Sequence, residues 1–149
     1  VKKQTSKDGR ISLIGNNGWM TREGHRARFD QQPIEAMAMV EACAEAYRCT
    51  RERIWLDRTR AFFGWFLGNN DTQSVLCDFS TGGCRDGLQA DGPNLNQGGE
   101  STLAWLIALL SLHDLNRSMD EDDGSMNKPK KFDLTSHSGK TIDANRENK

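Results

Sequence analysis

Two segments of this chain are apolar on almost every side of the helix they would form, and such helices must be covered by other elements. Residues 103–110 contain no charged side chain. Residues 34–50 carry only a few charged side chains, and their apolar residues form one broad stripe. The stripe consists of Ala36, Met37, Val40, Cys43, Ala44 and Tyr47. We therefore expect a helical fold with these two helices inside.

Local signals place three helices along the chain. Pro33 suits the first turn of a helix, where its missing N–H would have no partner, so the first helix is expected from Ile34 to about Thr50. The second is expected over about Arg51–Leu67, with the apolar and charged faces of an outer helix. The third is expected over about Glu100–Asn116. The apolar face of the second helix consists of Trp55, Phe62, Phe63, Phe66 and Leu67.

A short internal similarity relates the starts of the two inner helices. Gln32–Ala36 and Gln97–Ser101 each stand before an apolar helix, and each has a Glu three residues after a Gln. In that position, Glu35 and Glu100 could cap free N–H groups at the positive end of a helix. An inner, outer and inner order is typical of stacked helical hairpins. The predicted fold is all-α, with helical hairpins of a partial α/α toroid and long loops rich in Gly, Asn and Asp; chance similarity is the alternative.

The polar segments set the predicted domain boundary. Residues 1–117 are expected to form the helical domain, with Ile11–Ile14 as a short strand or extended edge. After Arg117 the chain is dominated by acidic residues and then by Lys and small polar residues. Residues 118–149 are therefore predicted to be a flexible polar tail, since they cannot bury enough apolar surface to offset the entropy of ordering. Because the chain begins with Val1, we expect it to be part of a longer protein.

Composition excludes several classes of protein. The chain has 149 residues, which suits one domain, and its net charge of -1 gives no electrostatic footprint for nucleic acid or an anionic membrane. Its longest apolar run is too short to span a membrane, and no signal peptide is visible, so we expect a cytoplasmic protein. The four cysteines form no CxxC pair, which predicts reduced thiols and no metal site. No cofactor is expected.

The polar loop over residues 68–99 is the main candidate for a binding site. A loop of this length is usually functional or disordered. Asp, Asn, Gln and Arg side chains offer paired donors and acceptors for sugar hydroxyls, and Trp19, Phe29 or Phe79 could stack on a sugar ring. The alternative is that the Asp and Asn residues only hold turns and helix ends. The candidate binding residues of this loop are Asp78, Thr81, Arg85, Asp86, Asn94, Asn96 and Gln97.

A second polar cluster precedes the first inner helix. If the hairpins stack, the N-termini of both inner helices face the same side, and the two clusters become neighbours. The alternative is an ion pair between Arg28 and Asp30 that fastens adjacent loops. The candidate binding residues of this cluster are Arg28, Asp30, Gln31 and Gln32.

Glycoside hydrolysis would need two carboxylates across a cleft. The candidates are Asp30, Asp78, Asp86 and Glu100, and no sequence spacing pairs them. Glu100 stands at a helix start, where a capping role is more common than a catalytic one. Cys84 has no matched His nearby and is interpreted as a small packed residue rather than a nucleophile.

Four stretches carry a resemblance to a known group of proteins. They read GWMTREGHRARFDQQPIEAMAMVEAC, FFGWFLGNND, DFSTGGCRDGL and NQGGESTLAWLIALL. Together, over about Ile14–Leu115, they resemble the C-terminal α/α-toroid region, with its six-hairpin glycosidase-like fold, of bacterial glycosyltransferase-like proteins. This resemblance implies that carbohydrate or a sugar nucleotide binds at the N-terminal ends of the inner helices.

The resemblance also bears on partners and activity. Three helices are too few for a toroid, so an N-terminal glycosyltransferase domain or self-association would complete it. This chain itself lacks the strand–helix alternation and dinucleotide fingerprint of a Rossmann-like domain. The predicted function is therefore that of a helical region of a bacterial glycosyltransferase that binds or processes carbohydrate. The alternatives are a non-catalytic module that docks a partner, and a glycoside hydrolase-like enzyme with paired carboxylates.

Overall fold

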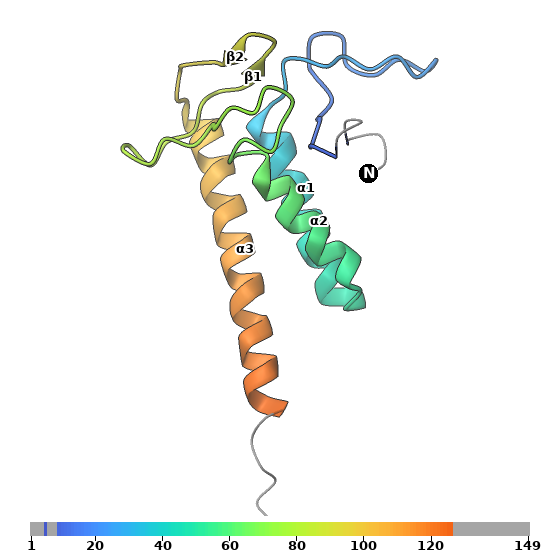
Figure 1. Cartoon of the computed structure of the whole chain (residues 1–149), viewed down its shortest axis with the longest axis vertical. Helices are drawn as coiled ribbons and strands as arrows, with labels where there is room; N and C mark the ends of the chain where they lie inside the picture. Colours follow the sequence, from blue (N-terminus) through green and yellow to red (C-terminus); the bar gives the residue numbers. More distant parts are fainter. Residues whose placement is uncertain (1–4, 6–8, 127–149) are drawn as a thin grey trace, which may run out of the picture.

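The computed structural model describes Thr5 and residues 9–126, with the backbone alone for residues 122–126. This part of the chain is mostly helical, as predicted, and its helices run side by side while the loops gather at one end (Figure 1). A two-stranded antiparallel sheet in the loops corrects the all-helical prediction. The elements are α1 (Pro33–Thr50), α2 (Arg53–Gly64), β1 (Leu88–Gln89), β2 (Gly92–Pro93) and α3 (Gly99–Met126).

Helix α1 is the inner helix that its sequence predicts. It packs against both α2 and α3, which contact each other much less. Ala36, Val40 and Ala44 are completely buried, and the small alanines let neighbouring helices approach closely. Pro33 occupies the first turn, and at the other end the N–H of Arg51 donates to the carbonyl of Tyr47 over 2.8 Å. The helix begins at Pro33, one residue before the predicted start, and ends at Thr50 as predicted.

Helix α2 supplies the aromatic core but is shorter than predicted. Phe63 stacks on Trp105 of α3 with 5.3 Å between ring centroids, and Phe66 lies 5.5 Å from the same ring. The helix ends at Gly64 rather than Leu67, and the backbone then turns sharply through Gly68, where φ is 100°. Phe66 therefore reaches the core from this turn.

A buried asparagine holds the turn after α2. The Nδ2 group of Asn70 donates to the carbonyl oxygens of Trp65, over 2.8 Å, and Ser74, over 2.7 Å. Its Oδ1 accepts the amides of Thr72 and Ser74. A fully buried amide needs such partners, since an unpaired one would be costly. Asp71 also lies in this turn.

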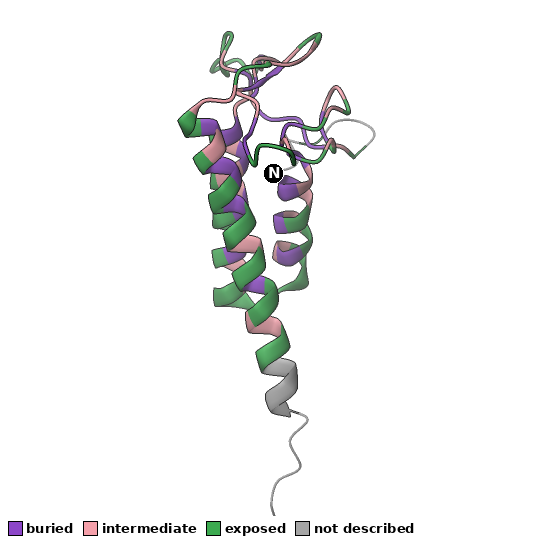
Figure 2. Cartoon of the chain, turned by 90° about the vertical axis from the view of Figure 1, so that its left-hand side faces the viewer, coloured by how far each residue is buried: buried purple, intermediate pink, exposed green. Residues whose placement is uncertain are grey.

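Helix α3 differs most from its prediction. It buries Trp105 and Ala108, but the opposite side stays exposed within the described part of the chain (Figure 2). That side holds large aliphatic residues that are 37–60% exposed: Leu103, Leu106, Ile107, Leu109 and Leu110. Helix α3 was predicted to be covered on all sides, but only one of its faces is buried.

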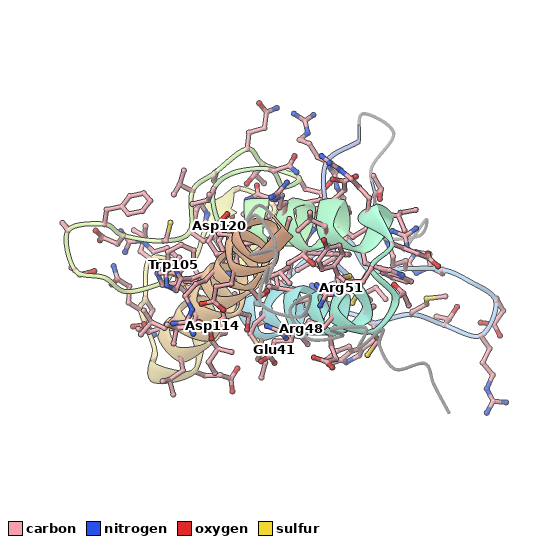
Figure 3. The ribbon with its side chains drawn as sticks, turned by 90° about the horizontal axis from the view of Figure 1, so that it is seen from below. Glu41, Arg48, Arg51, Trp105, Asp114 and Asp120 are labelled. Atoms are coloured by element: carbon pink, nitrogen blue, oxygen red, sulfur yellow. The ribbon has the colours of Figure 1, made fainter. Side chains whose placement is uncertain are left out.

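The C-terminal boundary of the helical region is also corrected. Helix α3 continues to Met126, well past the expected end at Asn116, so it includes residues 118–126 of the predicted tail. An ion pair of 3.6 Å between Arg117 and Glu121, one turn apart, supports this extension. The rest of the predicted tail, residues 127–149, lies outside the described residues. Figure 3 looks along the helices from this end, with Asp114 and Asp120 labelled on α3.

The N-terminal segment crosses the loop end. Ile11–Ile14, predicted as a short strand or extended edge, forms no regular strand, but Ile11 makes an isolated antiparallel bridge with Thr5. Ile11 and Leu13 are buried in the core, and the N–H of Ile11 donates to the carbonyl of Asn69 over 3.2 Å. A turn follows at residues 16–18. Gly15 touches the backbone of Phe29 so closely that a Cβ atom at residue 15 would overlap it.

Candidate functional site

The two polar clusters are neighbours, as the stacking argument predicts. Gln31 and Leu88 form an antiparallel bridge, with N–H to carbonyl distances of 3.0 Å and 2.9 Å in the two directions. Gly87 lies directly beside it, and a Cβ there would come within 3.2 Å of the Nε2 atom of Gln32. The start of α1 is therefore fastened to the polar loop by backbone pairing.

Gln31 is the centre of a buried hydrogen-bond network. Its Oε1 accepts the indole N–H of Trp65 over 2.8 Å, and its Nε2 donates to the carbonyl of Arg28 over 2.9 Å. The same Nε2 group donates to the carboxylate of Asp71. Because this side chain is fully buried and engaged on both ends, it serves the fold rather than a ligand. The structure thus gives Gln31 a different role from the predicted one.

Asp71 is the residue of this region that sequence reasoning missed. Its carboxylate is only 3% exposed and pairs with the guanidinium of Arg28 at 3.0 Å, while Arg28 is 62% exposed. The alternative of a pair between Arg28 and Asp30 is therefore wrong. Asp30 and Gln32 are half-buried at the start of α1. The acidic residue in the stretch FLGNND was a visible signal, but nothing in its spacing linked it to Arg28.

A second network surrounds Asp78 in the polar loop. Its Oδ1 accepts the amide of Ser80 over 3.0 Å and the hydroxyl of Ser80 over 2.6 Å. Its Oδ2 accepts the Nε2 group of Gln97 over 3.0 Å and lies 3.6 Å from the guanidinium of Arg85. Gln97 in turn accepts the hydroxyl of Thr81 over 2.8 Å. Four predicted site residues, Asp78, Thr81, Arg85 and Gln97, are thus brought together.

Asp86 anchors the start of α3. Its Oδ1 accepts the amide of Gly98, the residue before the helix, over 2.6 Å, and its Oδ2 accepts the amide group of Asn96. The hydrogen bond from Gly98 lowers the pKa of this carboxyl below its ordinary value. The acidic residue bound to the backbone at this helix start is Asp86 from the loop, while Glu100 is exposed. The helix dipole also favours a negative charge here.

Asn94 and Asn96 hold the segment before α3, as the alternative interpretation proposed. The Oδ1 of Asn94 accepts the amide of Asn96 over 3.0 Å, and the amide of Asn94 donates to the carbonyl of Gly87 over 2.9 Å. Arg85 donates to the carbonyl of Leu95 over 2.6 Å, which closes the same segment. These contacts fasten residues 94–96 to Arg85 and Gly87.

An apolar pocket adjoins the Asp78 network. Its volume is about 440 Å³, within the range of ligand pockets, and Asp78 belongs to both its lining and the network. Phe79, which belongs to the lining, is 78% exposed. By contrast, Phe29 packs against the core, with the Arg28 guanidinium 5.3 Å from its ring centroid, so Phe29 offers no platform for a sugar. The apolar lining consists of Phe63, Leu67, Phe79, Trp105, Leu106 and Leu109.

The carboxylates suit binding better than acid catalysis. A general acid needs a proton at neutral pH and therefore a raised pKa. Hydrogen bonds instead lower the pKa of Asp78 to about 2 and shift that of Asp86 in the same direction. The two residues belong to different networks. The described residues contain no group of three or more His, Cys, Asp or Glu side chains that could hold a metal ion.

The low pKa of Asp78 predicts a pH effect. Hydrogen bonds from Ser80 are its largest cause, and they lower the pKa from 3.8 to about 2. A lowered pKa stabilises the fold above pH 3.8, and this contribution is lost as the pH falls from there towards 2. In an NMR titration, we expect the Asp78 carboxyl to titrate near pH 2 and to move towards its ordinary value in Ser80→Ala. Val75→Ala, exposed and outside the network, should leave the midpoint in place; an equal midpoint in wild type and Ser80→Ala would contradict the assignment.

Comparison with known proteins leaves the family open. No protein-family model matches the chain, and no curated protein matches it either. Among the described residues, no helix combines the length and the apolar character needed to cross a membrane. The resemblance to the toroid region of glycosyltransferase-like proteins therefore stays a prediction.

Proposed function

We propose that this chain is a carbohydrate-binding helical module of a bacterial glycosyltransferase or a related carbohydrate-active enzyme. One observation carries the proposal: a network of Asp78, Thr81, Arg85 and Gln97 borders an apolar pocket with the exposed ring of Phe79 beside it. Sugars present both hydroxyl groups and apolar ring faces, so a site for them needs polar and apolar groups side by side.

The chemistry of the network supports sugar binding. Thr81 is exposed, and its hydroxyl can donate and accept. The Asp78 carboxylate stays ionised at neutral pH, since its pKa is about 2, and a charged acceptor strengthens hydrogen bonds from hydroxyl groups. Phe79 and the aromatic residues of the pocket offer a surface for the apolar face of a ring. A sugar or a sugar nucleotide is the ligand we propose.

The arrangement of the helices is compatible with part of an α/α toroid. Helices α1 and α3 both begin at the loop end, where the proposed site lies, and α2 returns between them in the sequence (Figure 1). We propose that further helices of a glycosyltransferase, or a second copy of this chain, complete the toroid in the cytoplasm. The exposed aliphatic face of α3 supports this proposal, because a complete toroid would cover it.

A ligand titration tests the proposed function. Isotope-labelled chain is titrated with free sugars, oligosaccharides and nucleoside diphosphate sugars, and amide shifts are expected in residues 78–83 and 95–98. Phe79→Ala should weaken binding about tenfold, the equivalent of losing one favourable aromatic contact. Trp19→Ala is the matched control, since Trp19 is 66% exposed but lies outside the pocket lining. If no ligand shifts these amides, or Trp19→Ala has the same effect as Phe79→Ala, the proposal is wrong.

A partner-docking module is the second candidate, and the aliphatic face of α3 favours it. Five large side chains exposed on one helix exceed the scattered apolar residues of ordinary surfaces. If docking is the main role, Leu103→Ser combined with Leu110→Ser should reduce binding of a hydrophobic dye and leave sugar binding unchanged. Strong dye binding that persists in the double variant would contradict a docking face on α3.

A further inference from the structure

Cys77 and Cys84 lie opposite each other where the polar loop closes on itself. They form an antiparallel bridge. The amide of Asp78 donates to the carbonyl of Gly83, and the amide of Arg85 donates to the carbonyl of Leu76, each over 2.8 Å. These hydrogen bonds flank the two cysteines, so Cys77 and Cys84 form a non-hydrogen-bonded pair of an antiparallel ladder.

This type of pair suits a disulfide. Residues in such a position have Cα atoms about 4.5 Å apart, and their side chains project from the same face. Disulfides form over Cα separations of about 4.4–6.8 Å. The backbone around Cys77 and Cys84 therefore already meets the main requirement for a covalent link.

The surroundings leave each of these sulfurs little contact with solvent. Cys77 is 6% exposed and Cys84 is 0% exposed, and both belong to the main hydrophobic core. The thiol of Cys77 donates to the carbonyl of Phe66 over 3.7 Å, and the thiol of Cys84 to that of Arg85 over 3.4 Å. All four cysteines of the chain are free thiols in this structure. Burial raises the pKa of Cys77 and raises that of Cys84 to about 12, so both thiols should react slowly.

We propose that Cys77 and Cys84 are an oxidant-dependent modification site, at which a peroxide converts the two thiols into an intramolecular disulfide. Cys77 reacts first because it is the more exposed of the two. Its thiolate attacks one peroxide oxygen, the O–O bond breaks, and the leaving hydroxide takes up the thiol proton as water. The sulfur of Cys84 then attacks the sulfenic acid of Cys77 and displaces a second water. Two thiols are oxidised, and one peroxide is reduced to two waters.

The disulfide would fasten the two ends of the segment 78–83. This segment carries Asp78, Phe79 and Thr81, so oxidation would restrict the part of the loop that borders the pocket. The reaction depends only on the cysteine pair. It is therefore independent of the proposed carbohydrate function and can succeed or fail by itself.

The experiment follows the masses of peptides after oxidation of the full chain. Cys49 is exposed and is first replaced in Cys49→Ser to prevent links between molecules. The folded chain is treated with hydrogen peroxide, freed of excess oxidant, denatured, alkylated and digested with trypsin. Cys77 and Cys84 share one tryptic peptide, residues 61–85. We expect this peptide to lose two hydrogen atoms and both alkylation sites, while Cys43 remains fully alkylated.

Control variants separate the pair from general oxidation. With Cys84→Ser added, no disulfide can form within the peptide, so the mass loss of two hydrogen atoms should disappear. Cys77 should then carry added oxygen or be alkylated. If that variant does not fold by circular dichroism, Cys77→Ser serves instead and should leave Cys84 fully alkylated. The proposal is overturned if both thiols of the unsubstituted pair stay alkylated, if they end as sulfinic acids, or if either links to Cys43.

Discussion

Gln31→Leu is expected to destabilise the fold by about 3 kcal/mol or more. Leucine fills a similar volume but removes the acceptor for the Trp65 indole and the donor to Asp71. The side chains of Trp65 and Asp71 are both buried. Each buried polar group left without a partner costs about 1–3 kcal/mol, and a charged one costs more. The carboxylate of Asp71 would keep Arg28 as its remaining partner. The free energy of unfolding, measured by chemical denaturation, tests this expectation.

The neighbouring glutamine provides the matched control. Gln32 is half-buried, and its side chain makes no capping hydrogen bond to α1. Gln32→Leu should therefore change the free energy of unfolding by about 0.5 kcal/mol or less, as is usual away from such networks. Similar losses in the two variants would show that the buried network of Gln31 contributes little.

Gly15→Ala is expected to destabilise the fold by about 1–3 kcal/mol or to prevent folding. The added methyl group would overlap the backbone of Phe29, and a backbone cannot move aside as a flexible side chain can. Phe29 leads directly into the buried Gln31, so the strain would reach the start of α1. A fall in melting temperature relative to wild type is the measurement.

Gly99→Ala serves as the control for this substitution. Gly99 begins α3, and nothing lies within 4 Å of the position its Cβ would take. Alanine also favours the helical conformation over glycine. The melting temperature of Gly99→Ala should therefore equal or exceed that of wild type. A Gly15→Ala chain as stable as Gly99→Ala would mean that the segment before α1 adapts to the added methyl group.

The sequence was most informative about helices whose position depends on one apolar face. The apolar stripe and Pro33 predicted α1 with its correct end at Thr50, because both signals are local. Of the predicted apolar face of the second helix, Phe62, Phe63 and Phe66 lie in the core, whereas Leu67 is exposed. The end of α2 was missed, since it depends on Asn70, which binds backbone groups on both sides of the turn.

The candidate site was predictable as a segment but not as a set of partners. The polar loop over residues 68–99 stood out through composition, and the pairing of Asp78 with Gln97 lies within it. The pairing of Arg28 with Asp71 joins segments far apart in sequence, and composition carries no information on such distances. Asp86 rather than Glu100 binds the backbone at the start of α3, because a loop that folds back can bring a distant carboxylate to a helix end.

The exposed face of α3 and the apolar pocket share two residues, Leu106 and Leu109. Any helix, domain or second chain that covers this face would therefore also form a wall of the pocket. Assembly and ligand binding would then be thermodynamically linked. The bound partner would change the affinity for the ligand by the same factor by which the bound ligand changes the affinity for the partner. The isolated chain should consequently bind a ligand with a different affinity from the assembled protein.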